Sequence, residues 1–171
     1  MVTISFLFDD FIIAEEMLMS EISTDELNKI LKSTHVTGVD AFLSDNKESL
    51  ITSDRPFCDY MREKIHENGL RQQDIFLDAD ISEKYGYKLL SEEKRTRQRD
   101  VILRICYASG LNLDETQKAL RLYRMPELYS KIKRDALLMI AFNERPGDII
   151  SVNAFLKKNG VDILRSCGTQ E

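Results

Sequence analysis

Apolar residues recur at intervals of three and four positions along most of the chain, and this period predicts amphipathic helices. One clear case follows Pro56, where the apolar face consists of Phe57, Tyr60, Met61 and Ile65. Pro56 suits the first helical position, because its missing backbone N–H would have no partner there. Asn68 and Gly69 are typical of a helix end. The pattern therefore predicts a helix that begins at Pro56 and stops before Gly69.

Residues 69–104 contain two short helical patterns with a tight turn between them, then a basic loop and a longer helical pattern. Ile75 and Ala79 lie four positions apart in the first short pattern. Ser82 opens the second, and its hydroxyl can accept a hydrogen bond from a backbone N–H of the first turn. The apolar positions of this second pattern are Tyr85, Leu89 and Leu90. Two helices with so short a connection must cross steeply and share a core, which is the geometry of a helix-turn-helix.

Residues 1–55 predict an acidic, mainly helical arm. Residues 9–19 have helix-like apolar spacing, and a short helix is expected around 39–43. Ser23 and Glu26 match a capping box at the start of a further helix. Residues 2–8, VTISFLF, fit either a short strand or a packing strip. The arm could cover an apolar surface of its own protein or bind a partner.

The C-terminal part of the chain predicts several more helices. A core helix over residues 101–106 stops at Ser109-Gly110, and an Asn112/Glu115 cap pattern precedes a helix over 116–122. We expect Pro126 to begin another helix. Its apolar run, ALLMIAF (136–142), has no polar face and predicts burial on most sides. The final expected helix has Asp148 as its cap, runs through Leu156 and stops at Gly160.

These patterns together predict an all-α protein. We expect one shared core that contains Ile75, Ala79, Ile81, Leu89, Val101, Ile102 and Ile105. We also expect Cys106 to be a small core residue rather than a nucleophile, because it lies on the apolar face of its helix.

Residues 69–95 resemble the helix-turn-helix of the lambda-repressor-like (Cro/C1/Xre) family. The matching positions, in one ungapped stretch, are Gly69, Leu70, Gln72, Ile75, Ile81, Ser82, Leu89, Lys94 and Arg95. Residues 103–120 are similar to the family's closing segment, and the whole chain resembles small bacterial proteins of no settled function. The resemblance implies a lambda-repressor-like bundle over residues 56–125. Residues 1–55 would then be an N-terminal arm, and residues 126–171 a helical extension packed on the same core.

Three positions depart from the family pattern. Phe76 stands where the family has a small residue, and Asp80 replaces the glycine of the turn. Aspartate tolerates the left-handed conformation that such a turn requires. Gly86 lies inside the second helix, where the family has an apolar residue. We expect Gly86 to leave a bare spot that lets the helix backbone approach a DNA groove closely.

The resemblance also implies a DNA-binding site. In the family, the second helix enters the major groove and flanking groups fix the DNA backbone. The residues that would face base edges are Ser82, Glu83, Lys84, Tyr87 and Lys88. The residues that would contact phosphates are Gln72, Lys94, Arg95 and Arg97. Arg99 belongs to the same basic cluster at the start of the following helix.

The charge distribution is uneven, although the net charge of the 171 residues is only −5. Residues 1–60 hold 4 Lys and Arg against 12 Asp and Glu, whereas residues 61–125 hold 13 against 11. This balance argues against a protein that coats nucleic acid or acidic membranes indiscriminately. A positive patch is local to the predicted helix-turn-helix, which leaves specific DNA binding open.

The sequence contains no pattern that predicts catalysis, a metal site or a cofactor. Metal-ligand spacings such as CxxC and HExxH are absent, as are GxGxxG and Walker-type phosphate loops. The three widely spaced cysteines suit a reducing cytoplasm. The apolar start, residues 1–7, lacks a cationic region and runs into Asp9-Asp10, so we expect neither a signal peptide nor a membrane span.

Two functions remain in view. The first is a non-enzymatic, sequence-specific transcriptional regulator of the Xre type that binds double-stranded DNA as a homodimer. The second is a protein-protein interaction adaptor in a bacterial signalling or regulatory assembly. An adaptor would keep the helix-turn-helix only as a scaffold, since fold does not fix function.

Overall fold

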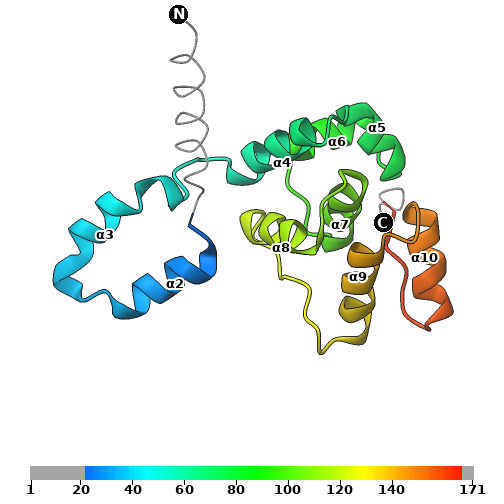
Figure 1. Ribbon diagram of the computed structural model, residues 1–171. Coiled ribbons are helices and arrows are strands. Elements are labelled where there is room, and N and C mark those ends of the chain that lie inside the picture. Colours follow the sequence, from blue (N-terminus) through cyan, green and yellow to red (C-terminus); the bar gives the residue numbers. More distant parts are fainter. Residues whose placement is uncertain (1–21, 167–171) are drawn as a thin grey trace, which may run out of the picture. The chain divides into compact units, whose positions relative to one another are not determined.

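The computed structural model of the chain describes residues 22–166. This range contains nine α-helices and no strand, which confirms the predicted all-α class (Figure 1). The expectations for residues 2–8 and 9–19 lie outside the described residues. The chain divides into two compact units, and the boundary along the sequence falls between Thr52 and Ser53.

The first unit is described over residues 22–52. Its helices are α2 (Thr24–Ser33) and α3 (Val39–Asp45), with short 3-10 turns at Val36–Gly38 and Lys47–Ser49. The predicted capping box is confirmed. The Ser23 hydroxyl accepts from the backbone N–H of Glu26, whose carboxylate accepts from the backbone N–H of Ser23. The short helix expected around 39–43 is confirmed as α3.

This first unit has no apolar core within residues 22–52, where Asn46 is the one buried residue. Both of its helices carry apolar side chains that solvent reaches. The most exposed are Ile30, Leu31, Val36, Val39, Leu43 and Ile51. A segment this short needs a core or a partner for stability. Because its apolar side chains are exposed, they are available for such contacts with other residues.

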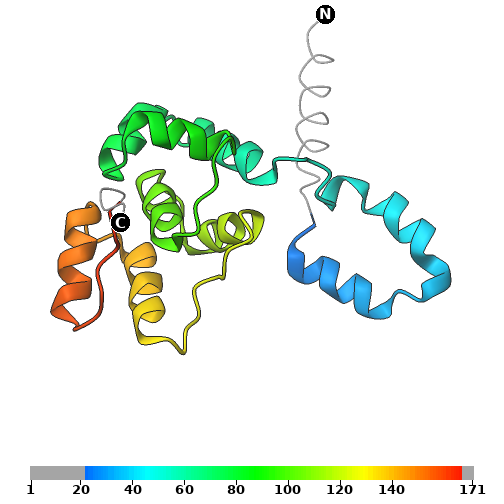
Figure 2. The same ribbon diagram turned by 180° about the vertical axis from the view of Figure 1, so that it is seen from behind.

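The second unit, described over residues 53–166, is a bundle of seven helices (Figures 1 and 2). The helices are α4 (Pro56–Glu67), α5 (Gln72–Asp78), α6 (Glu83–Leu90), α7 (Arg99–Ala108), α8 (Leu113–Leu122), α9 (Lys133–Glu144) and α10 (Ile149–Lys158). Helix α7 contacts α5, α8 and α10, while α4 contacts α6 and α8. Helix α9 contacts α8 and α10. The central position of α7 explains its burial, since Val101 to Tyr107 are all buried.

The predicted core is confirmed. Its members Ile75, Ala79, Ile81, Leu89, Val101, Ile102 and Ile105 all belong to one buried cluster. Helices α9 and α10 contribute to the same cluster, through residues such as Leu138, Phe142 and Leu156. Cys106 is fully buried as expected, and burial raises the pKa of its thiol to about 12. The C-terminal helices therefore complete the core of the second unit.

Most predicted helix boundaries in this unit are confirmed. Helix α4 begins at Pro56, and Gly69 follows its end with a φ of 63°. Asn112 and Glu115 form a capping box at the start of α8. The carboxylate of Asp148 caps α10 by accepting from the backbone N–H of Ser151 at 2.8 Å.

One expectation for the C-terminal part is wrong. Pro126 does not begin a helix, because α9 begins at Lys133. The side chain of Gln117 makes two hydrogen bonds of 2.8 Å with the backbone of Leu128, whose side chain is buried, and these contacts hold the segment extended. The apolar run 136–142 is buried on most sides as expected, since Leu138, Ala141 and Phe142 are buried and Leu137 and Met139 pack against the core, and only Ile140 in the run is exposed, at 48%.

Candidate nucleic-acid interface

Helices α5 and α6 contact one another and are joined by the short turn from Ala79 to Ser82. Asp80 adopts a φ of 55°, the left-handed conformation expected for this turn from the sequence pattern. The buried guanidinium of Arg104 donates to the carbonyl oxygen of Ala79 at 2.8 Å and to the Asp80 carboxylate at 3.3 Å. It also donates to the carbonyl oxygen of Leu164 at 3.0 Å. Arg104 thus fixes the turn to the C-terminal segment of the unit.

The other two departures from the family pattern compensate for one another. Phe76 on α5 is fully buried, and Gly86 on α6 is buried beside it. A Cβ atom at Gly86 would lie 2.4 Å from the Cδ1 atom of Phe76. The aromatic ring therefore fills the space that an apolar side chain at position 86 would occupy.

This packing corrects the expectation that Gly86 leaves a bare spot for a DNA groove. Gly86 faces the interior of the bundle, together with Leu89 and Leu90 on the same helix. The glycine serves the close approach of α5 and α6, because a larger residue would collide with the ring of Phe76.

The opposite side of α6 faces solvent. Ser82, Glu83, Lys84 and Tyr87 are all exposed, and Lys88 is partly exposed. Ser82 is the N-cap residue of α6, but its hydroxyl makes no capping hydrogen bond, so that part of the prediction is wrong. The Lys88 ammonium lies 2.9 Å from the Glu93 carboxylate, which neutralises one of the expected base-facing charges. The ring of Tyr87 also contacts Phe76 edge-on, at 5.0 Å between centroids.

The loop between α6 and α7 carries the basic cluster. Lys94 and Arg97 are exposed, and the ammonium of Lys94 lies 5.1 Å above the ring centroid of Tyr85.

Arg95 is half-exposed but strongly held, since it donates to Glu92 at 3.0 Å and to the carbonyl oxygen of Tyr123 at 2.5 Å. Its guanidinium also stacks on the Tyr123 ring at 4.5 Å. Arg95 anchors the loop to the end of α8, so Lys94 and Arg97 are the less constrained cations.

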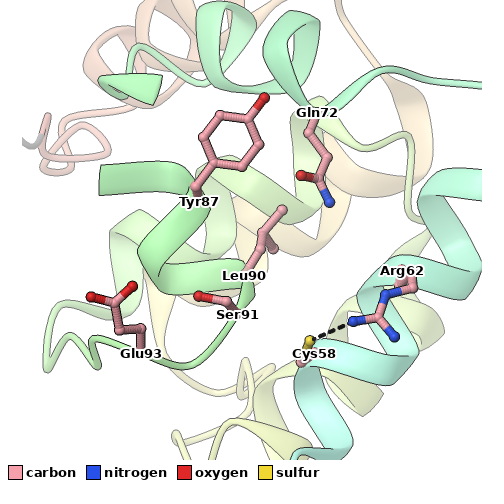
Figure 3. Close-up of a pocket in the computed structure, with 7 residues that line it drawn as sticks. All are labelled: Cys58, Arg62, Gln72, Tyr87, Leu90, Ser91 and Glu93. Atoms are coloured by element: carbon pink, nitrogen blue, oxygen red, sulfur yellow. Dashed lines mark hydrogen bonds between the residues drawn. The ribbon is translucent and has the colours of Figure 1, made fainter. Parts of the chain in front are cut away.

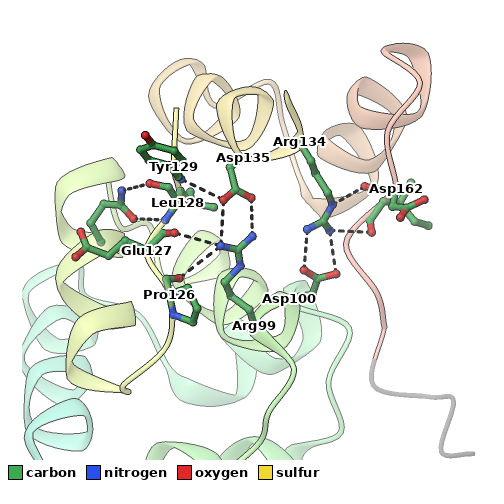
Figure 4. A network of polar contacts seen from close by, with 11 residues as sticks. Arg99, Asp100, Pro126, Glu127, Leu128, Tyr129, Arg134, Asp135 and Asp162 are labelled. Atoms are coloured by element: carbon green, nitrogen blue, oxygen red, sulfur yellow. Dashed lines mark hydrogen bonds and ion pairs between the residues drawn. The ribbon is translucent and has the colours of Figure 1, made fainter. Parts of the chain in front are cut away.

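Arg99 does not belong to this exposed cluster. Its guanidinium makes a two-pronged contact with the buried carboxylate of Asp135, at 3.1 and 2.5 Å (Figure 4). It also donates to the carbonyl oxygen of Glu127 at 3.2 Å. Arg134 makes a parallel contact with Asp100, at 3.1 and 2.9 Å. These two pairs join the start of α7 to the start of α9, and Arg99 is therefore a structural residue.

A shallow pocket of about 290 Å³ lies between α4, α6 and the start of α5 (Figure 3). Its lining consists of Cys58, Arg62, Gln72, Tyr87, Leu90, Ser91 and Glu93. The pocket places Gln72, an expected phosphate contact, on the same side of the bundle as Tyr87, an expected base contact. Arg62 on α4 reaches the same side, 3.4 Å from the Cys58 sulfur. The sequence pattern did not single out Arg62, because its position on the polar side of α4 looks like ordinary solvated surface.

The exposed side chains of this arrangement are hydroxyl, carboxylate, amide and cationic groups. Within residues 22–166, no group of three or more His, Cys, Asp or Glu side chains lies close enough together to hold a metal ion. No helix in this range combines the length and apolar character needed to cross a bilayer. No family model, curated protein or solved structure matches the chain.

Proposed function

We propose that this chain is a sequence-specific DNA-binding regulator of the Xre type, which reads the major groove with α6. The observation that carries the proposal is the division of α6 into two faces. Gly86, Leu89 and Leu90 lie against the bundle, while the opposite face presents hydrogen-bonding side chains to solvent. A recognition helix needs such a division, because it must be held firmly and still project base-reading groups into a groove.

The proposed base-reading residues are those on the outer face of α6. Ser82, Lys84 and Tyr87 offer hydroxyl and ammonium groups that suit the acceptors of the major-groove edge. Glu83 would accept a hydrogen bond from the amino group of a cytosine, which is the one favourable role for a carboxylate there. Lys88 would contact DNA only after it leaves Glu93, so we expect it to contribute less.

The proposed phosphate contacts flank this helix. Gln72 at the start of α5 and Lys94 and Arg97 in the loop after α6 are the side chains free to move toward a DNA backbone. Arg95 would contribute charge from its anchored position. The two described cysteines, Cys58 and Cys106, are free thiols, which agrees with a reducing cytoplasm as the proposed setting.

The salt dependence of DNA binding tests the phosphate contacts. Arg97→Gln should weaken binding to every duplex sequence by a similar factor. It should also reduce the slope of log K against log salt concentration by roughly 0.9, because one phosphate contact is lost. Lys157→Gln is the matched control, since Lys157 is an exposed cation near the end of α10, outside the proposed site. Equal slopes for both variants would contradict the assignment of Arg97.

Tyr87→Phe tests the base contacts separately. This change removes one hydroxyl and keeps the ring contact with Phe76. We expect a loss of preference at one base pair, by about 1–3 kcal/mol if the hydroxyl makes a good direct contact. The salt slope should stay the same. A variant that weakens all sequences equally would show that Tyr87 does not read bases.

A second candidate function is a protein-protein interaction adaptor. The observation that favours it is the first unit, in which no apolar side chain of residues 22–52 is buried. The acidic balance of residues 1–60 adds charge by which a basic partner could be recognised. An adaptor would show no preference among DNA sequences, and Leu31→Lys in α2 would abolish capture of its partner.

A further inference from the structure

Helix α9 has two unlike faces. Asp135, Leu138, Ala141 and Phe142 are buried against the bundle. The other side of the helix reaches solvent at Ile140, which is 48% exposed, and in part at Ala136 and at Leu137, whose side chain also packs against the core. Ile132, the residue that precedes the helix, is also 51% exposed. An apolar strip on a helix surface that solvent can reach is a feature of contact sites.

The exposed strip has a charge at each end. Lys133, Leu137, Ile140 and Glu144 follow one another at steps of four, three and four residues. At 3.6 residues per turn, these steps place all four side chains in one row along the helix. Lys133 and Glu144 are both exposed, and neither makes an ion pair with another residue in the range 22–166. From the start of α9 to its end, the row therefore consists of a cation, two apolar side chains and an anion.

A row of this kind is complementary to itself when it is reversed. If two copies of α9 lie antiparallel across a two-fold axis, each Lys133 comes beside Glu144 of the other copy. Leu137 of each copy then meets Ile140 of the other. The small side chain of Ala136 leaves room for the branched Ile140, so the two helices could approach closely. Such a contact is isologous, because both copies use the same surface.

We propose that α9 is a homodimer interface, in which two copies of the chain pair through antiparallel α9 helices. The charge pattern selects a second copy rather than an unrelated partner, because each end of the row matches the opposite end of the same row. The ion pairs of Arg99 with the buried Asp135 and of Arg134 with Asp100, both partly buried, hold α9 firmly, so the strip is rigid before it pairs. This proposal does not depend on DNA binding.

Sedimentation equilibrium of the full chain without DNA tests the interface. The wild-type protein should show a concentration-dependent dimer. Ile140→Lys should raise the dimer dissociation constant by about tenfold or more, because it introduces a charge at the centre of the apolar strip. The matched control is Ile150→Lys on α10. Ile150 is 76% exposed and lies outside the strip, so this variant should dimerise like the wild type. Circular dichroism of each variant verifies that it is folded.

A charge exchange makes the test specific to the antiparallel arrangement. Lys133→Glu alone and Glu144→Lys alone should each weaken the dimer, because each places like charges opposite one another. The variant with both changes should recover the wild-type dissociation constant to within about twofold, since its row is again self-complementary. A monomeric wild type at high concentration would overturn the proposal, as would an Ile140→Lys variant that dimerises normally. Failure of the double exchange to restore the dimer would overturn the antiparallel pairing.

Discussion

Gly86→Ala gives a sharp test of the packing between α5 and α6. Inside a helix, alanine is usually more stable than glycine by about 1 kcal/mol. The new Cβ atom, however, would lie 2.4 Å from Cδ1 and 2.7 Å from Cγ of Phe76, well inside contact distance. The ring is fully buried and cannot swing away freely. Overpacking of this kind costs about 1–3 kcal/mol, so after the gain in helix propensity we expect a net loss of up to about 2 kcal/mol in the free energy of unfolding.

The sign of this effect should depend on residue 76. Phe76→Ala by itself should cost about 3–5 kcal/mol, because it removes a fully buried ring. In the Phe76→Ala background, Gly86→Ala no longer meets the ring and should stabilise the protein by about 1 kcal/mol. The two changes are therefore coupled, and a double-mutant cycle measures the coupling.

Urea unfolding of the four proteins, followed by circular dichroism, provides the free energies. Lys84→Ala is the control on the same helix, and its effect should stay within about 0.5 kcal/mol because Lys84 is exposed. If Gly86→Ala stabilises the protein in both backgrounds, the ring of Phe76 does not fill the space beside Gly86, and the account of this packing is wrong.

Two further predictions concern the second unit. Arg99→Gln should lower the free energy of unfolding by about 3 kcal/mol, because it leaves the buried Asp135 carboxylate without its cation, and urea unfolding measures this loss. The second prediction is that ionisation of the buried Cys106 thiol lowers the free energy of unfolding at alkaline pH. Its folded pKa is raised to about 12, whereas an unfolded thiol ionises near a pKa of about 8.5. The stability is therefore complete below about pH 8.5 and falls as pH rises toward 12, a loss that Cys106→Val should reduce in unfolding measurements across this range.

The sequence predicted the parts of the fold that depend on local pattern. The apolar period and the caps located α4 through α8, and the seven predicted core residues are buried. Asp80 was correctly placed in a left-handed turn, because aspartate tolerates that conformation. These features depend on residues a few positions apart, so one sequence contains the information for them.

The errors concern partners that are distant in the sequence. Arg99 looked like a surface cation because its partner, Asp135, lies 36 positions away. Pro126 looked like a helix start because Gln117, which holds the segment after it, belongs to another helix. Gly86 looked like a gap because only the packed structure shows the ring of Phe76 beside it.

The exposure of the candidate site residues could be predicted only in part. The outer face of α6 follows from the helical period, but the engagement of Arg95 with Tyr123 and of Lys88 with Glu93 does not. These contacts decide which cations are free, and they make Lys84, Lys94 and Arg97 the best probes of the proposed interface.

Selection from a random pool of duplex oligonucleotides measures whether the outer face of α6 reads DNA sequence. The purified full chain is used at about 150 mM salt, where non-specific binding is weak. A DNA-binding regulator should enrich one motif, and Tyr87→Phe should relax that motif at a single base pair. If the wild-type protein enriches no motif under these conditions, the outer face of α6 does not read DNA, and the proposed function is contradicted.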